Sequence, residues 1–314
     1  MKKSNLGGTL LILSATLIWG VGVVALTAGM DYMGPFTLSS VRFLLGGSCA
    51  LGPALYFAKR NPGTPGRAGL QSAVFGLQTD QPEKTESKKH FFWSCVFCGL
   101  VLCTGASLRQ FALLYTSVGR VTFITSLFVI IVPLVGLFFG RRVSKKVWFG
   151  VLVSLVGMYF LGFSGGVNFN LGDILAFICA FVFALHILLI NRFSKVKNIL
   201  ALASIQAFTV GILSLVLALI FESPSFSAIF EGLRYVLYAG IMSSFVAHIM
   251  QIRAQKTTDP AIASILFSME AVFATITGWL VLNQFLTVRE IIGCALLFVA
   301  VVLAKLPLPE RRRL

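Results

Sequence analysis

A single carboxylic acid, Glu270, stands within the apolar stretch ILFSMEAVFATITGWLVL (Ile265–Leu282). If this stretch is a helix entered near residue 261, Glu270 lies about 13–14 Å from its start. An ionised acid at such a depth in a bilayer costs on the order of 2.5–3.5 kcal/mol, so an acid placed there is either a candidate functional residue or a structural partner of a buried cation. Three states lower the cost: Glu270 is protonated, it pairs with Arg42, or it faces water and substrate. The chemistry it offers is reversible protonation or the binding of a cationic group.

A polar stripe between residues 232 and 252 is the second candidate. Gly240, Ser244, His248 and Gln251 recur at helical spacing, so they lie on one helix face. A polar face on a membrane helix points to the bundle interior or to a cavity. Two interpretations stand: hydrogen bonding between helices, or a binding surface made by Ser244, His248 and Gln251.

Four further residues extend this candidate site. Gln110 and Trp19 lie within apolar runs, where each either packs in the bundle or lines a cavity. Arg42 and Arg109 lie in the outer halves of their runs and are candidate charge partners, for Glu270 or for an anionic group of a substrate.

Membrane helices are the elements that must position these residues. The chain is 57% hydrophobic and 12% charged, whereas soluble domains carry about 25% charged residues. A bilayer core requires about 20 apolar residues in a helix, which satisfies its own backbone. The sequence predicts an all-α membrane protein with ten spans, near 7–27, 35–58, 91–115, 121–140, 147–164, 172–191, 199–221, 232–252, 261–282 and 290–307.

The basic residues orient these spans. Of the 26 Lys and Arg residues, 21 fall at the termini or in even-numbered loops, including the long loop 59–90. The odd-numbered loops hold Arg120, Arg234 and Arg289. By the positive-inside rule, this predicts a multi-pass protein of the cell (cytoplasmic or inner) membrane with both termini cytoplasmic.

The two halves of the chain resemble each other. RQFALLYTSVGRVTFITSLF parallels MQIRAQKTTDPAIASILFSM, and FFGRRVSKKVWFGVLVSLVGM parallels VLNQFLTVREIIGCALLFVAV. This predicts two five-helix repeats, residues 1–165 and 166–314, and an odd number of spans inserts them in opposite orientations. Inverted repeats are typical of secondary transporters, whose site lies where the repeats meet. Gln110 aligns with Gln251, and the two amides are expected to face each other there.

The sequence resembles the drug/metabolite transporter superfamily, EamA-type. The matching segments are ATLIWGVGVV, PFTLSSVRFLLGG, ALLYTSVGRVTFITSLFVIIVPLVGLFFGRR and MQIRAQKTTDPAIASILFSMEAVFATITGWLVLNQFLT, in order along the chain. The resemblance implies ten helices around a central cavity and transport of small organic metabolites such as amino acids, amines or drug-like compounds. Alternating access and, by family tendency, export are implied with it.

Two positions depart from that family pattern. Ala271 stands where the family usually has Pro after the acid, and because Pro kinks a helix, a straighter helix is expected here. Arg141 and Gln284 replace acids that the family tends to carry at two helix ends, so a role for those acids is not expected in this chain.

Other classes of function are disfavoured. The histidines His90, His186 and His248 lack ligand-spaced partners, so neither a metal site nor an intramembrane enzyme is expected. Cys95 and Cys98 are interpreted as packing residues and His186 as a satisfied bundle residue. No cofactor and no nucleic acid are expected; the partners are the lipid bilayer, a small-molecule substrate and, as coupling ion, protons. A channel or a non-transporting adaptor remains the alternative.

Overall fold

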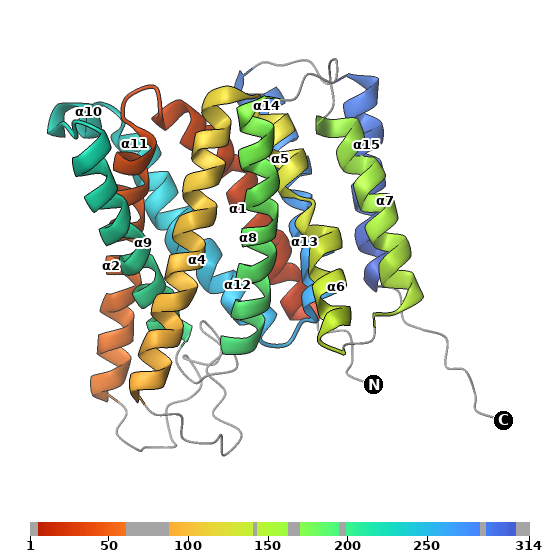
Figure 1. The fold of residues 1–314 in the computed structure, drawn as a ribbon, viewed down its shortest axis with the longest axis horizontal. Helices are drawn as coiled ribbons and strands as arrows, with labels where there is room; N and C mark the ends of the chain where they lie inside the picture. Colours follow the sequence, from red (N-terminus) through yellow and green to blue (C-terminus); the bar gives the residue numbers. More distant parts are fainter. Residues whose placement is uncertain are drawn as a thin grey trace.

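The protein is a bundle of long helices (Figure 1), seen in a computed structural model of the 314-residue chain. The structure describes residues 6–60, 88–140, 143–162, 170–194, 199–282 and 287–305. All regular elements in these ranges are helical, which confirms the predicted all-α membrane fold. Most of loop 59–90, the repeat boundary at 165/166, Arg141 and Gln284 lie outside the described residues.

The helices follow the predicted apolar runs. They are α1 (Leu6–Gly29), α2 (Pro35–Arg60), α4 (Lys88–Tyr115), α5 (Val118–Thr125), α6 (Phe128–Phe138), α7 (Lys145–Gly162), α8 (Leu171–Phe193), α9 (Ile199–Phe221), α10 (Phe226–Glu231), α11 (Leu233–Leu237), the π-helix η2 (Tyr238–Ala247), α12 (His248–Gln255), α13 (Pro260–Phe267), α14 (Met269–Leu282) and α15 (Val288–Lys305).

Nine segments of the described chain are long and apolar enough to cross a membrane. Three of them combine more than one element: α5 with α6, α11 with η2 and α12, and α13 with α14. The tenth predicted run, 290–307, corresponds to α15, which starts at Val288 beside Arg289 and Glu290. The count of ten spans stays a prediction.

The contacts between helices repeat when the two halves are exchanged. α2 packs on its counterpart α9, and α7 packs on its counterpart α15. The packing of α4 on α8 recurs as that of η2 and α12 on α1, and the packing of α1 on α14 recurs as that of α8 on α5 and α6. In Figure 1, α1 rises from the end of the bundle where α15 finishes, whereas α8 descends towards it. These contacts are those expected of two inverted repeats.

Glycines bring α7 and α15 into direct backbone contact. A Cβ on Gly293 would lie 2.8 Å from the carbonyl oxygen of Gly157 and from Cγ of Leu161. In the repeat alignment Gly293 corresponds to Gly150 and Gly157 to Ala300, and a Cβ on Gly150 would lie 3.4 Å from the carbonyl oxygen of Ala300. The same contact therefore occurs twice, more tightly at Gly293.

An acid ties α9 to α2 at the end of the bundle where α2 begins. Glu222, just after α9, accepts hydrogen bonds from the backbone N–H groups of Phe36 and Thr37 at 2.8 Å each and from the Thr37 hydroxyl at 2.6 Å. These N–H groups at the start of α2 have no partner within the helix, and the helix dipole favours a negative charge there. The contact caps α2 with a residue from the other half of the chain.

Two spans are interrupted at corresponding positions. The first break lies at Ser126 and Leu127, between α5 and α6, and the second lies at Ser268, between α13 and α14. Ser268 donates its hydroxyl to the carbonyl of Ile265 at 2.6 Å, so the side chain competes with the helix ladder. The interruption lies three residues before Ala271, and α14 continues unbroken through Ala271 itself; the expectation of a straighter helix there stays a prediction.

The glycine contact predicts opposite effects of one substitution at two sites. Gly293→Ala is expected to lower the melting temperature of the purified protein by several degrees, because the added methyl group pushes α7 from α15, an overpacking cost of about 1–3 kcal/mol. Gly52→Ala is the control, since nothing lies within 4 Å of its added Cβ. It should raise the melting temperature slightly, because Ala favours helix by about 1 kcal/mol over Gly. Equal shifts in both variants would contradict the contact.

Candidate functional site

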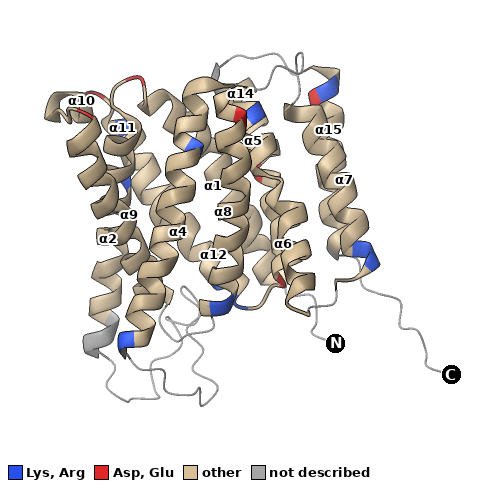
Figure 2. Ribbon diagram, viewed as in Figure 1, with Lys and Arg blue, Asp and Glu red and all other residues tan. Residues whose placement is uncertain are grey.

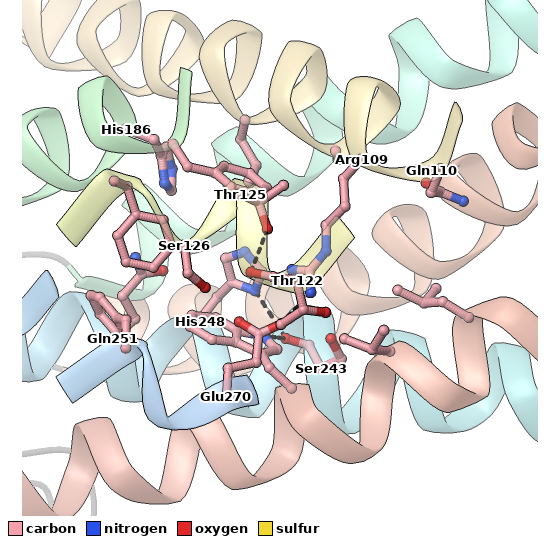
Figure 3. A pocket seen from close by; sticks show the side chains of 18 of the residues that line it. Arg109, Gln110, Thr122, Thr125, Ser126, His186, Ser243, His248, Gln251 and Glu270 are labelled. Carbon is pink, nitrogen blue, oxygen red and sulfur yellow. Dashed lines mark hydrogen bonds and ion pairs between the residues drawn. The ribbon is translucent and has the colours of Figure 1, made fainter. Parts of the chain in front are cut away.

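A cavity lies in the middle of the bundle between the two halves (Figure 3). Its walls come from α1, α2, α4, the α5–α6 break, α8, η2, α12, α13 and α14, whereas α7, α9 and α15 do not reach it. The apolar part of the lining includes Trp19, Phe43, Phe128, Phe183 and Phe267. Its polar part is Arg42, Arg109, Gln110, Thr122, Thr125, Ser126, His186, Ser243, His248, Gln251 and Glu270.

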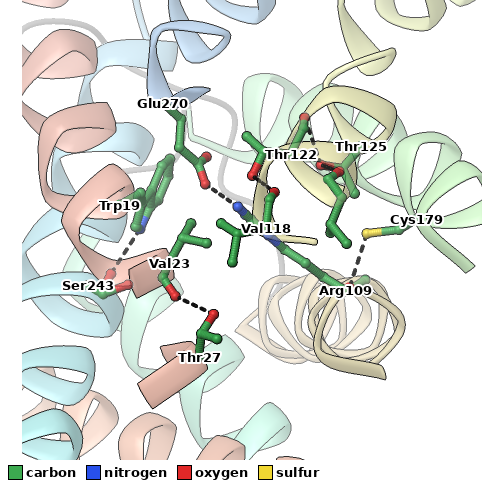
Figure 4. Close-up of polar contacts among 12 residues, drawn as sticks. Trp19, Val23, Thr27, Arg109, Val118, Thr122, Thr125, Cys179, Ser243 and Glu270 are labelled. Carbon is green, nitrogen blue, oxygen red and sulfur yellow. Dashed lines mark hydrogen bonds and ion pairs between the residues drawn. The ribbon is translucent and has the colours of Figure 1, made fainter. Parts of the chain in front are cut away.

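An ion pair crosses the cavity between the halves. Arg109 of α4 donates from Nη2 to the carboxylate of Glu270 on α14 (Figure 4). The Arg109 side chain is 17% exposed and that of Glu270 11%, so both charges are largely withdrawn from water but open to the cavity. The pairing of Glu270 with Arg42 considered from the sequence is wrong. Arg109, the other candidate charge partner, holds the acid.

Arg42 is held differently. It is 5% exposed, and its Nη1 donates to the Ser244 hydroxyl at 3.4 Å. Its guanidinium lies over the ring of Phe43, 4.2 Å from the centroid, a cation–π contact. Within the described chain its Nε makes no hydrogen bond. Arg42 thus adds a positive charge to the cavity wall with no acid bound to it there, whereas Ser244 stands behind it and is absent from the lining.

The two repeat-related glutamines both line the cavity but do not face each other. Gln110 accepts a hydrogen bond from the Ser39 hydroxyl and donates to the carbonyl of Pro35 at 3.1 Å. Both of those partners lie at the start of α2. Figure 3 places Gln110 and Gln251 at opposite sides of the cavity. The expectation of facing amides is wrong, because the Gln110 side chain is turned to α2.

One backbone carbonyl organises the wall at η2. The carbonyl oxygen of Ser243 accepts a hydrogen bond from Trp19 Nε1 at 3.2 Å, and His248 Nδ1 lies 2.9 Å from it. A carbonyl only accepts, so His248 carries a proton on Nδ1. The Trp19 and His248 rings meet edge to face at 5.4 Å. Trp19 and His248 therefore line the cavity as a fixed aromatic corner.

The hydroxyls of the α5 wall are bonded within their own helix. Thr122 donates to the carbonyl of Val118 at 2.8 Å, and Thr125 donates to that of Val121 at 2.7 Å. A hydroxyl oxygen that donates its proton keeps lone pairs for accepting. These side chains present acceptors to the cavity next to Arg109 (Figure 4).

His186 of α8 lines the cavity, although the sequence was interpreted as placing it in the bundle with its polar atoms satisfied. It is 3% exposed, and its Nε2 makes no hydrogen bond with the described residues. The prediction of a satisfied bundle residue is wrong. Spacing alone gave no signal for it, since His186 is an isolated polar residue on an apolar helix.

Metal ligands are not gathered anywhere in the ranges that the structure describes, where no group of three His, Cys, Asp or Glu side chains is close enough to hold an ion. Cys95 and Cys98 are fully buried among apolar side chains. The cavity chemistry is therefore carried by an ion pair, an arginine, amides, hydroxyls and imidazoles.

Comparisons with known proteins find a family and individual proteins of similar sequence. A family model described as the EamA-like transporter family matches residues 6–163 and 170–306. An uncharacterized transporter from Archaeoglobus fulgidus is 29% identical over 92% of this chain and 83% of its own length. The uncharacterized transporter YoaV from Bacillus subtilis is 21% identical over 95% and 94%.

A solved structure supports the fold alone. It is titled only as the crystal structure of a protein, has a TM-score of 0.72 and 21% identity, and is matched over 95% of this chain and 98% of that chain. The arrangement of helices is therefore one already seen in a crystal.

The ion pair predicts non-additive effects on stability. Glu270→Gln leaves the largely buried Arg109 guanidinium without a counter-charge. Arg109→Gln likewise leaves the largely buried Glu270 carboxylate without a counter-charge. Removing both should cost less than the sum, by about 0.5–3 kcal/mol. Thermal unfolding of the two single variants and the double variant measures this difference. Strictly additive shifts would mean that the two groups are not coupled.

Proposed function

The chain belongs to the EamA-like transporter family and is a multi-pass membrane transporter, and we propose that it moves small organic metabolites by secondary-active, alternating-access transport. The substrates in view are amino acids, amines or drug-like compounds. The direction proposed is export, which rests on the family resemblance. The charge distribution supports a location in the cell membrane with both termini cytoplasmic.

The observation that carries this proposal is the Arg109–Glu270 pair, which lies in a cavity lined by both apolar and polar side chains. Apolar walls that carry convergent polar groups are the usual form of a small-molecule site. A substrate with a cationic group can compete for Glu270, and one with an anionic group can compete for Arg109 or Arg42. The aromatic corner at Trp19 suits an apolar body.

The repeats supply a route for the cavity to open to each side in turn. The pair joins α4 of the first half to α14 of the second, so relative movement of the halves must strain or break it. The breaks at Ser126 and Ser268 put interrupted helices beside the cavity, as in transporters that rock one repeat against the other. The binding of a substrate or a proton must then offset the free energy that is lost when Arg109 and Glu270 separate.

Protonation of Glu270 offers a coupling mechanism. A neutral carboxyl no longer attracts Arg109, so proton uptake would release the contact between the halves and proton loss would restore it. In this mechanism the Glu270 carboxylate binds one partner at a time: a proton, the Arg109 guanidinium or a cationic group of the substrate. We propose protons as the coupling ion on this basis.

Flux through reconstituted protein tests the transport proposal. Proteoliposomes should take up or release at least one member of a panel of amino acids, amines and small drug-like compounds. Leu102→Trp, which fills the cavity wall, should lower the rate at least tenfold by excluding substrate while leaving the helices assembled. If the panel moves at the rate of empty liposomes, the proposal of metabolite transport fails.

Coupling predicts that flux responds to an imposed pH gradient. One proton per substrate gives about tenfold accumulation for each pH unit. Glu270→Gln should abolish that response, because the amide does not titrate. Glu231→Gln is the matched control, since Glu231 is an exposed acid outside the spans, and it should keep the response. Full gradient dependence in Glu270→Gln would make Glu270 a structural residue.

A further inference from the structure

A second pocket lies far along the bundle from the central cavity, between the start of α4 and the end of α8. We call it the basic groove, and its lining residues are Lys89, His90, Trp93, Ser94, Phe97, Arg192 and Phe193. α4 and α8 pack on each other along their length. The groove is thus a notch where two neighbouring spans leave the apolar layer.

The two cations of this groove are free to bind an anionic ligand. Lys89 and Arg192 are exposed, and among the described residues the ion pairs are those of Arg109 with Glu270 and Arg120 with Asp173. Ser94 is not available as a donor, since its hydroxyl already donates to the carbonyl of His90 at 2.9 Å. The groove therefore offers two positive charges at one mouth.

The rest of the groove is aromatic and faces outward. Trp93 is 59% exposed and Phe97 is 48% exposed. Tryptophan is enriched where a membrane protein meets the headgroups, and apolar rings below it contact acyl chains. A soluble anion would use the two cations and leave these rings unused, whereas a lipid uses both.

The end of the bundle around the groove is mainly basic. Figure 2 shows Lys and Arg at the starts of α4 and α7 and at the end of α8, whereas most acids lie at the opposite end. The exception at the groove end is Asp259, the N-cap of α13. The residues at the groove end include Lys145, Lys146, Arg253 and Lys256. A positively charged surface at the membrane attracts anionic lipid headgroups, and each Lys or Arg near the headgroups adds to this attraction.

We propose that the basic groove binds an anionic phospholipid, with its phosphate between Lys89 and Arg192 and its upper acyl chain against Trp93 and Phe97. The bound lipid bridges α4 and α8, the helices that carry Arg109 and His186 into the cavity. The proposal is independent of what the protein transports.

Lipid binding to the whole purified protein tests the groove. Native mass spectrometry in detergent would compare phosphatidylglycerol with phosphatidylcholine, added separately at equal concentration. The unmodified protein should retain phosphatidylglycerol roughly tenfold more. Lys89→Gln/Arg192→Gln should remove most of that preference, and Lys89→Gln alone should remove part of it.

The control removes the same charge elsewhere at that end. Lys145→Gln/Lys256→Gln should keep the preference for phosphatidylglycerol. Equal retention of both lipids by the unmodified protein, or an unchanged preference in Lys89→Gln/Arg192→Gln, would overturn the proposal. Displacement of phosphatidylglycerol by millimolar glycerol phosphate would also overturn it, because the groove would then be a site for a soluble anion.

Discussion

A carboxylate withdrawn from water needs a counter-charge, and this requirement shapes the middle of the protein. Glu270 meets it through Arg109, which lies in the other half of the chain. Neither half therefore has a satisfied interior without the other. The cavity surrounds this contact, so the position that is electrostatically most demanding is also the one most open to a small molecule. A site built in this way is held together by the same interaction that a ligand must replace.

Hydrophobic runs and charge bias predicted the all-α membrane fold, and the helices lie where those runs lie. They could not predict the partner of Glu270, because depth along a helix says nothing about rotation around its axis. Arg42 and Arg109 both lie near the acid in depth, and only Arg109 is turned towards it. The break at Ser268 was missed for a related reason, since a serine whose hydroxyl bonds to its own helix leaves no mark in composition.

The polar stripe of residues 240–251 shows where a periodic argument fails. Helical spacing assumes hydrogen bonds from residue i to i+4, but η2 follows the wider π pattern. Ser244 and His248 therefore do not present the same face: His248 lines the cavity, whereas Ser244 stands behind Arg42. In this π-helix the Ser243 carbonyl oxygen accepts hydrogen bonds from the side chains of Trp19 and His248. A backbone oxygen therefore fixes the positions of Trp19 and His248 in that wall. Such a role of the backbone cannot be recognised from residue types in the sequence.

The paired glycine contacts between α7 and α15 have a consequence for the symmetry of the bundle. Gly293 touches Gly157, and their repeat counterparts Gly150 and Ala300 touch in the same way. In an isologous dimer interface, residue i meets j and j meets i. The reciprocal contact in this one polypeptide is the pattern that two subunits related by a two-fold axis would show. The two contacts are not identical, since an added Cβ would lie 2.8 Å from the facing carbonyl oxygen at Gly293 and 3.4 Å from it at Gly150, so the two-fold relation between the halves is approximate.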